Sequence, residues 1–152
     1  EILALSNAEA RMLLHRYYDD VQIPRLMAHP AALFMTDAWP EPSGVQNASA
    51  YGAFPKFLAT ARSTGCLSLP QVVARMTGRA AERFGLTGRG LIRDGQAGDI
   101  VVFDWDRIAD HTHPGNPTAR PDGIEHVFIN GEAAVLNGAP MPPRRSGRFI
   151  SV

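Results

Sequence analysis

The feature that most constrains this sequence is a short apolar run, Ala32–Thr36, that ends on a carboxylate, Asp37. Trp39-Pro40 follows at once, and proline breaks the pattern. An apolar run of this length, bounded by turn signals, predicts a strand that is buried on both faces. An acid at the carboxyl end of such a strand lies where α/β folds, barrels included, place their catalytic side chains. The simpler interpretation is that Asp37 only caps the following turn, and the strand pattern taken alone favours it.

The residues before this run predict the closing half of a parallel α/β unit. Ser6–Tyr18 is expected to be a helix, because Ser6 and Glu9 match a capping box and apolar residues recur at helical spacing. A short helical turn from Pro24 to Met27 follows, and His29-Pro30 ends it, since the residue before proline avoids the α region. A helix, a short connection and an apolar strand are typical of a parallel α/β arrangement.

The residues after the run predict a loop that leaves the carboxyl end of the strand. Residues 38–49 are rich in Pro, Gly, Ser and Asn. Because α/β barrels bind their substrates at this end, polar side chains here are candidates for substrate contact. We identify Asn47, Ser49 and Tyr51 as these candidates.

Two helices and then a set of short strands are expected further along. Ser68 is placed as the N-cap of a helix that ends at Thr77-Gly78, and a second short helix is expected over Arg79–Phe84. From Gly88 the pattern changes to short β-branched segments separated by glycines. These segments are Ile100–Phe103, Ile124–Ile129 and Ala133–Leu136. Asn130-Gly131 between the last two predicts a β-hairpin, because this dipeptide suits a tight two-residue turn.

Composition excludes several classes of protein. The chain has 152 residues and is 45% hydrophobic, which indicates a globular domain with a core of its own. Fifteen basic residues balance fifteen acidic ones and form no basic patch, so nucleic acid is not expected as a partner. No apolar run approaches the ~20 residues that cross a bilayer, so no membrane partner is expected either. The single cysteine, Cys66, cannot form an internal disulfide and is consistent with a reducing, cytoplasmic compartment.

One histidine pair has the spacing of a metal site. His111 and His113 are two residues apart, as on one face of a strand. They lie in a loop before Pro114, and no third ligand is near them in the sequence. Because zinc takes three or four protein ligands, a solvated loop is the better interpretation of this pair.

Three stretches together resemble the amidohydrolase superfamily, which comprises metal-dependent hydrolases built on a (β/α)8 barrel. Met35-Thr36-Asp37 resembles the acid at the end of the last barrel strand. Gly90–Asp104 is similar to the return into the small β-sandwich domain, and Ile124–Gly131 to the hairpin near the carboxyl end. Within the superfamily, His29-Pro30 and Tyr51–Lys56 look like the corresponding parts of the N-acyl-D-amino-acid deacylases, or D-aminoacylases.

The resemblance implies an α/β fragment in two parts. Residues 1–87 would be the carboxyl-terminal end of the hydrolase barrel, and residues 88–152 would be strands of the small β-sandwich domain. A complete barrel needs about 250 residues, so the chain is expected to be the carboxyl-terminal portion of a longer protein. A missing N-terminal segment or another copy would then complete the barrel, and the strand Ala32–Thr36 should have unpaired edges.

The activity that the resemblance implies is zinc-dependent hydrolysis of a C–N amide bond, with an N-acyl-D-amino acid as the small-molecule substrate. Asp37 would contact the metal or its water, take a proton during attack and deliver it to the leaving amine. The remaining zinc ligands are expected outside this chain, so the fragment alone should be inactive. Two alternatives stay open: a cyclic-amide hydrolase related to dihydroorotases and hydantoinases, and a non-catalytic α+β interaction module.

Overall fold

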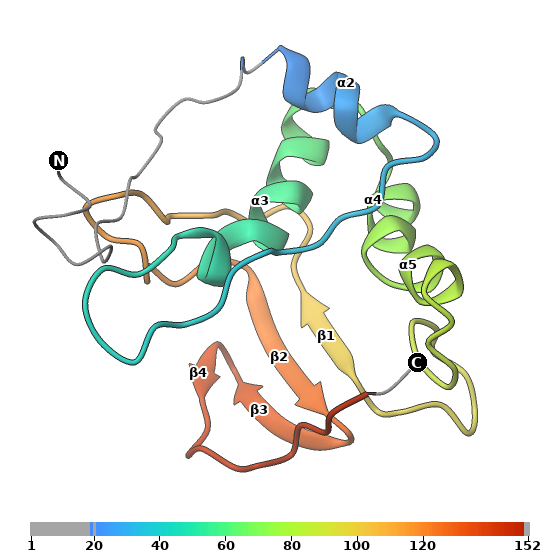
Figure 1. Cartoon of the computed structure of the whole chain (residues 1–152), viewed down its shortest axis with the longest axis vertical. Helices are drawn as coiled ribbons and strands as arrows, with labels where there is room; N and C mark the ends of the chain where they lie inside the picture. Colours follow the sequence, from blue (N-terminus) through green and yellow to red (C-terminus); the bar gives the residue numbers. More distant parts are fainter. Residues whose placement is uncertain (1–18, 20, 151–152) are drawn as a thin grey trace, which may run out of the picture.

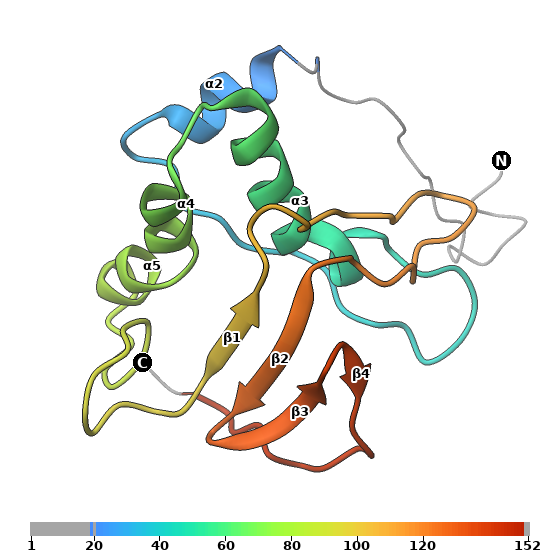
Figure 2. The same cartoon turned by 180° about the vertical axis from the view of Figure 1, so that it is seen from behind.

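The computed structural model describes residue 19 and residues 21–150 (Figure 1). The helix predicted over Ser6–Tyr18 lies outside these residues. Four helices gather on one side of a small sheet, as both views of the cartoon show (Figures 1 and 2). The elements in chain order are α2 (Gln22–Ala28), α3 (Ser49–Thr64), α4 (Leu69–Met76), α5 (Gly78–Arg83), β1 (Ile100–Phe103), β2 (Ile124–Ile129), β3 (Glu132–Leu136) and β4 (Ala139–Pro140).

Three of these helices follow the local signals in the sequence. α2 ends at Ala28 with His29 as its C-cap, directly before Pro30, as expected. α4 begins with a capping box in which Ser68 and Gln71 satisfy the free amides of the first turn. α5 follows α4 almost without a break and ends before Gly85. The described helices include none that is both long and apolar enough to cross a membrane.

The longest described helix, α3, was not predicted. It carries Pro55 in its interior, where proline removes one intrahelical hydrogen bond. Leu58 and Ala61 are buried in the core and stabilise the helix by packing. Gly65 ends it in the left-handed conformation, with φ of 66°.

The sheet is antiparallel, with the strand order β1-β2-β3-β4. Asn130 and Gly131 have φ angles of 49° and 84°, as a two-residue hairpin turn requires. The three strands predicted from the sequence are therefore confirmed. β4, which has two residues, was not predicted.

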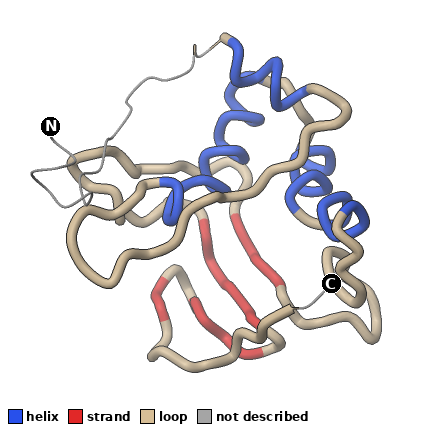
Figure 3. The backbone as a smooth tube through the Cα atoms, viewed as in Figure 1, coloured by secondary structure: helices blue, strands red, loops and turns tan. Residues whose placement is uncertain are grey.

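The strand expected over Ala32–Thr36 is not formed. Residues 32–41 carry no strand or helix and cross the molecule as an irregular segment (Figure 3). Only Phe34 of the run is buried, whereas Met35 is 64% exposed. A buried strand inside a parallel sheet pairs with neighbouring strands, and the described residues supply none beside residues 32–36. The doubly buried strand and the barrel that would contain it are therefore not observed in the described residues, and the expectation of unpaired strand edges stays a prediction.

The core joins the helices to the loop that follows β1. Phe34 stacks on Phe57 of α3 with ring centroids 4.6 Å apart. Ile108 is fully buried and lies in the same cluster, although it comes from the second part of the chain. The buried members of this cluster are Met27, Phe34, Leu58, Ala61, Leu67, Val72 and Ile108.

Candidate functional site

Asp37 lies on the irregular segment that leaves the core at Phe34. Its side chain is exposed, and its carboxylate forms no hydrogen bond or ion pair with another described residue. The carboxylate is therefore accessible to a ligand or to protein groups from outside the described residues. In the described part of the chain, Asp37 forms no side-chain hydrogen bond that would cap the following turn, which was the simpler interpretation of its position.

The two ends of the predicted loop meet beside Asp37. The Thr36 hydroxyl donates a 2.8 Å hydrogen bond to the backbone oxygen of Ser49, the first residue of α3. This bond places the backbone next to Asp37 against the helix start. Ser49, one of the predicted substrate contacts, is therefore brought close to the segment that carries Asp37.

The loop between them is organised by the side chain of Gln46. Its Oε1 accepts hydrogen bonds from the Glu41 amide at 2.9 Å and from the Tyr51 hydroxyl at 3.0 Å. Its Nε2 donates to the backbone oxygens of Glu41 and Gly44. Tyr51 thus stabilises the loop, and its phenolic oxygen keeps capacity to accept a further hydrogen bond.

The third predicted substrate contact, Asn47, supports the start of α3. Its Oδ1 accepts a 3.0 Å hydrogen bond from the Ser49 amide, and the side chain is exposed. Asn47, Ser49 and Tyr51 thus lie together at the start of α3. Their contact with a substrate stays a prediction.

Two arginines that the sequence reasoning missed hold the chain ahead of Asp37. Arg75 is 6% exposed, and its guanidinium donates to the backbone oxygens of Met27, Ala28 and His29 at the end of α2. Arg79 donates to the backbone oxygen of Pro30 at 2.7 Å. The signal in the sequence was a charge on the apolar face of α4, three residues after the fully buried Val72.

A third segment packs against the start of α3. Gly52 is buried, and a Cβ atom there would overlap the side chains of Asp110 and Thr112. Asp110 accepts hydrogen bonds from the amide and the hydroxyl of Thr112, at 2.9 and 3.1 Å. A glycine at position 52 therefore allows the loop after β1 to approach the helix closely.

Within the described residues, no group of three or more His, Cys, Asp or Glu side chains could hold a metal ion. His111 Nε2 lies 2.9 Å from Asp122 Oδ2, and His113 Nδ1 accepts a hydrogen bond from the Gly115 amide. Both histidines thus contact residues of the region between β1 and β2. Asp37 is one carboxylate, whereas zinc takes three or four protein ligands, so the described residues do not form a zinc site by themselves.

An apolar groove of about 1060 Å³ lies elsewhere, between the helices and the sheet. Its lining includes Leu58, Val73, Leu91 and Val101, and it includes no residue between 32 and 51. The walls are mostly apolar and can bind a side chain or a hydrophobic ligand, although Glu82 and Asp99 also line the groove. Because no residue between 32 and 51 lines it, the groove is separate from the candidate site at Asp37.

Comparison with known proteins places these features in context. A family model described as "Amidohydrolase family" matches residues 7–135. The D-aminoacylase of Alcaligenes xylosoxydans xylosoxydans is 34% identical over 134 residues, which are 88% of this chain and 27% of that protein. The N-acyl-D-glutamate deacylase of the same organism is 35% identical over 133 residues, 87% of this chain and 27% of that protein.

Solved structures agree with the sequence matches. A crystal structure of D-aminoacylase superposes with a TM-score of 0.75 and 31% identity, over 82% of this chain and 26% of that one. The N-acyl-D-glutamate deacylase of Bordetella bronchiseptica, complexed with zinc and a phosphonate inhibitor, gives a TM-score of 0.71 and 31% identity over 80% and 27%. The chain thus spans about a quarter of the length of these proteins.

Proposed function

Because the chain belongs to the amidohydrolase family, we propose that the polypeptide containing it hydrolyses a C–N amide bond of N-acyl-D-amino acids. The observation that carries this proposal is the similarity of most of the chain to deacylases of D-amino-acid derivatives, at 34% and 35% identity. Neither the described site nor the reported relatives favour a cyclic-amide hydrolase or a non-catalytic module. The proposed location is the cytoplasm, where the lone thiol of Cys66 would stay reduced.

The proposed enzyme needs more polypeptide than this chain. We propose that residues 1–87 form the end of a (β/α)8 barrel and residues 88–152 part of a small β domain. The irregular segment at 32–37 would then become the last barrel strand when its neighbours are present. Zinc is the proposed metal, with Asp37 as the one ligand from this chain and the other ligands from outside it. When bound, zinc would activate a water molecule and polarise the amide carbonyl.

Asp37 would act as the proton carrier of the reaction. Its carboxylate would take the proton of the attacking water and later deliver it to the nitrogen of the leaving amine. One carboxylate can serve both steps because they occur in sequence. The exposed carboxylate forms no hydrogen bond with another described residue, so both of its oxygens are available for this role.

Asn47, Ser49 and Tyr51 are the proposed substrate contacts. The Ser49 hydroxyl and the Asn47 amide group are exposed near the segment of Asp37 and can donate hydrogen bonds to a carboxylate. Tyr51 would act indirectly, because its hydroxyl already donates to Gln46. These side chains would orient the amino-acid part of the substrate.

The test is a substrate comparison with the full-length, metal-loaded protein. N-acetyl-D-amino acids should be hydrolysed, whereas their L-enantiomers, dihydroorotate and hydantoins should react far more slowly. The L-enantiomers are the matched control, since they contain the same amide bond. Preferential hydrolysis of a cyclic amide would contradict the proposal, and so would the absence of any amide hydrolysis.

A further inference from the structure

We propose that Arg75, assisted by Arg79, is a positioning residue that sets the place of the segment carrying Asp37. This inference rests on the proposed function, because it assigns Asp37 a reaction to serve. Neither arginine would touch the substrate. Both would act through the backbone of residues 27–34.

The Arg75 side chain binds the end of α2. Its Nη1 atom donates to the backbone oxygens of Met27 and His29, and its Nη2 atom donates to that of Ala28 at 3.2 Å. The last carbonyl groups of a helix lack intrahelical partners and carry partial negative charge. A guanidinium group satisfies several of them at once, because its donors are arranged in a rigid fork.

Two further bonds extend this attachment toward Asp37. The backbone oxygen of Arg75 accepts a 3.2 Å hydrogen bond from the Phe34 amide, and Arg79 donates to the oxygen of Pro30. The chain from α2 to Phe34 is thus bonded along its length to α4 and α5. Three residues after Phe34 the chain reaches Asp37, and the bond from Thr36 to Ser49 fixes the other side.

A buried cation at this position needs an explanation. Arg75 is 6% exposed, has no carboxylate partner among the described residues, and keeps its Nε atom buried without a hydrogen bond. Burial of a charge is costly unless it is well compensated. An apolar side chain, such as the neighbouring Val72, would fill an ordinary core position without that cost. The compensation that Arg75 receives comes from the backbone of the very segment that leads to Asp37.

The functional consequence follows from geometry. The side-chain bonds of Arg75 and Arg79 reach residues 27–30, directly ahead of the segment that is proposed to become a barrel strand, so they would set where that strand begins. Loss of those bonds would let residues 30–37 shift. Because misplacement of a catalytic group by about 1 Å can lower a rate about 10²-fold, a small shift would reduce turnover strongly.

The experiment uses the full-length, metal-loaded protein with paired variants. Arg75→Met and Arg79→Met remove the side-chain bonds to the segment. Arg62→Met is the control for Arg75, since Arg62 donates to the backbone oxygen of Trp105, at 2.6 Å, and holds a different segment. Arg83→Met is the control for Arg79, because Arg83 is exposed on the same helix and has no partner among the described residues. Kinetics and hydrogen–deuterium exchange of the peptide covering 30–37 are measured together.

We expect Arg75→Met to lower kcat about 10²-fold, Arg79→Met about tenfold, and both to leave KM within about threefold. Exchange of the amides at 31–37 should become faster in both variants and stay unchanged in the two controls. Arg75→Lys keeps the positive charge but has fewer hydrogen-bond donors, so it should retain part of the kcat that Arg75→Met loses. If Arg75→Met does not fold, Arg79→Met and Arg75→Lys carry the test.

Two results would overturn the proposal. The first is that kcat and the amide exchange of residues 31–37 in the Arg75 and Arg79 variants match those of the two controls. The second is a loss of kcat with no change in the exchange of this segment. The proposed function fails separately, through an active Asp37→Asn variant, which would also remove the catalytic part of this inference. The exchange measurement does not depend on activity, so the two failures are distinguishable.

Discussion

The sheet and the segment that carries Asp37 are held in opposite ways. The backbone groups of strands β1–β4 pair with one another in an antiparallel sheet, and the turn between β2 and β3 is formed by adjacent residues. Residues 29–37 have no strand pairing within the described residues and are held by the side chains of Thr36, Arg75 and Arg79 and by the backbone bond from Phe34 to Arg75. The sheet is therefore self-contained, whereas the candidate catalytic segment takes its position from other elements.

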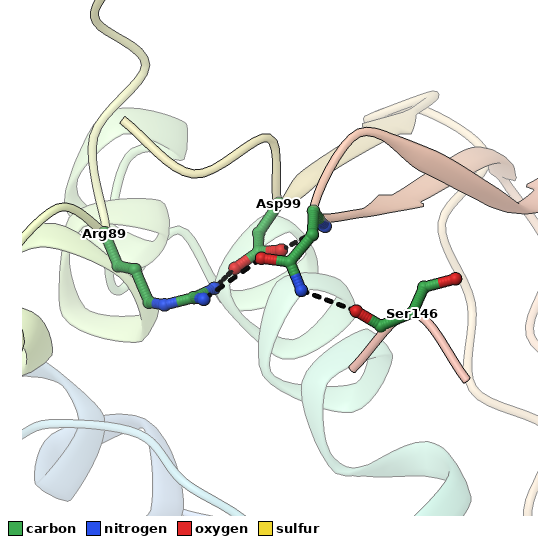
Figure 4. A network of polar contacts seen from close by, with 4 residues as sticks. Arg89, Asp99 and Ser146 are labelled. Atoms are coloured by element: carbon green, nitrogen blue, oxygen red, sulfur yellow. Dashed lines mark hydrogen bonds and ion pairs between the residues drawn. The ribbon is translucent and has the colours of Figure 1, made fainter. Parts of the chain in front are cut away.

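A network of polar contacts at the hairpin turn reinforces the sheet (Figure 4). Arg89 pairs with Asp99 and also donates to the Asn130 side chain at 3.1 Å. Asp99 accepts the Asn130 amide at 2.7 Å, and the Asn130 side chain donates to the backbone oxygen of Ser146. Segments far apart in the sequence are joined at one turn, and Asp37 is not among them. The comparison shows that a sheet held by its own strand pairing and a candidate catalytic segment held by contacts with α3, α4 and α5 can share one small core.

The largest effect that we predict is a loss of turnover when the segment that carries Asp37 is altered. Asp37→Asn in the full-length protein should lower kcat about 10²–10⁴-fold, because asparagine cannot carry the proton. The free energy of unfolding of the metal-free protein should change by less than about 0.5 kcal/mol, because the Asp37 side chain is exposed and forms no hydrogen bond with another described residue. Steady-state kinetics and urea unfolding measure the two quantities. Asp94→Asn, an exposed carboxylate outside the segment, is the control and should leave both unchanged.

A substitution in the sheet region should show the reverse pattern. In Gly98→Ala, the new Cβ atom would lie 2.8 Å from the Gly131 backbone nitrogen, so the chain beside the hairpin turn must shift. We expect a loss of about 1–3 kcal/mol in the free energy of unfolding, as for other overpacked sites, with kcat nearly unchanged. Urea unfolding checks this, and Gly147→Ala, which has open space around it, serves as the control. A stability equal to that of the control would show that the turn is looser than its contacts indicate.

The smallest effect that we predict is on stability and concerns Ser146, at the edge of the polar network around Asn130. The Ser146 hydroxyl donates a 2.6 Å hydrogen bond to Glu132 in an exposed setting. Ser146→Ala should reduce the free energy of unfolding by about 0.5 kcal/mol, because an exposed hydrogen bond largely replaces one with water. The backbone bond from Asn130 to Ser146 remains in this variant. A loss above about 2 kcal/mol exceeds the net contribution of a typical hydrogen bond. It would mean that the Ser146 hydroxyl, rather than its backbone oxygen, holds the chain around residue 146 in place.

The same contrast explains which parts of the fold could be predicted. The hairpin at Asn130-Gly131 and the start of α4 at Ser68 depend on neighbouring residues, so the sequence pattern was sufficient. α3 was missed because Gly52 and Pro55 disfavour a helix locally. Both are tolerated because Leu58 and Ala61 pack in the core and Gly52 admits the loop at Asp110. Tertiary packing overrode local propensity here.

The predicted strand at Ala32–Thr36 failed for a different reason. Its apolar pattern requires strands on both sides, and the described residues provide the Arg75 backbone oxygen as the partner of the Phe34 amide. The role of Arg75 could not be predicted, because its partners are backbone atoms more than forty residues away. Asp37, Asn47, Ser49 and Tyr51 were identified from the pattern around a strand end, and their chemistry stays a prediction.

The most direct test of the central claim is a structure of the full-length, metal-loaded protein with a phosphonate analogue of an N-acyl-D-amino acid. A relative has been solved with a phosphonate inhibitor and zinc. We predict that an Asp37 carboxylate oxygen lies within hydrogen-bond reach, about 2.6–3.2 Å, of a phosphonate oxygen. An Asp37 side chain directed into bulk solvent, away from the inhibitor, would contradict the claim.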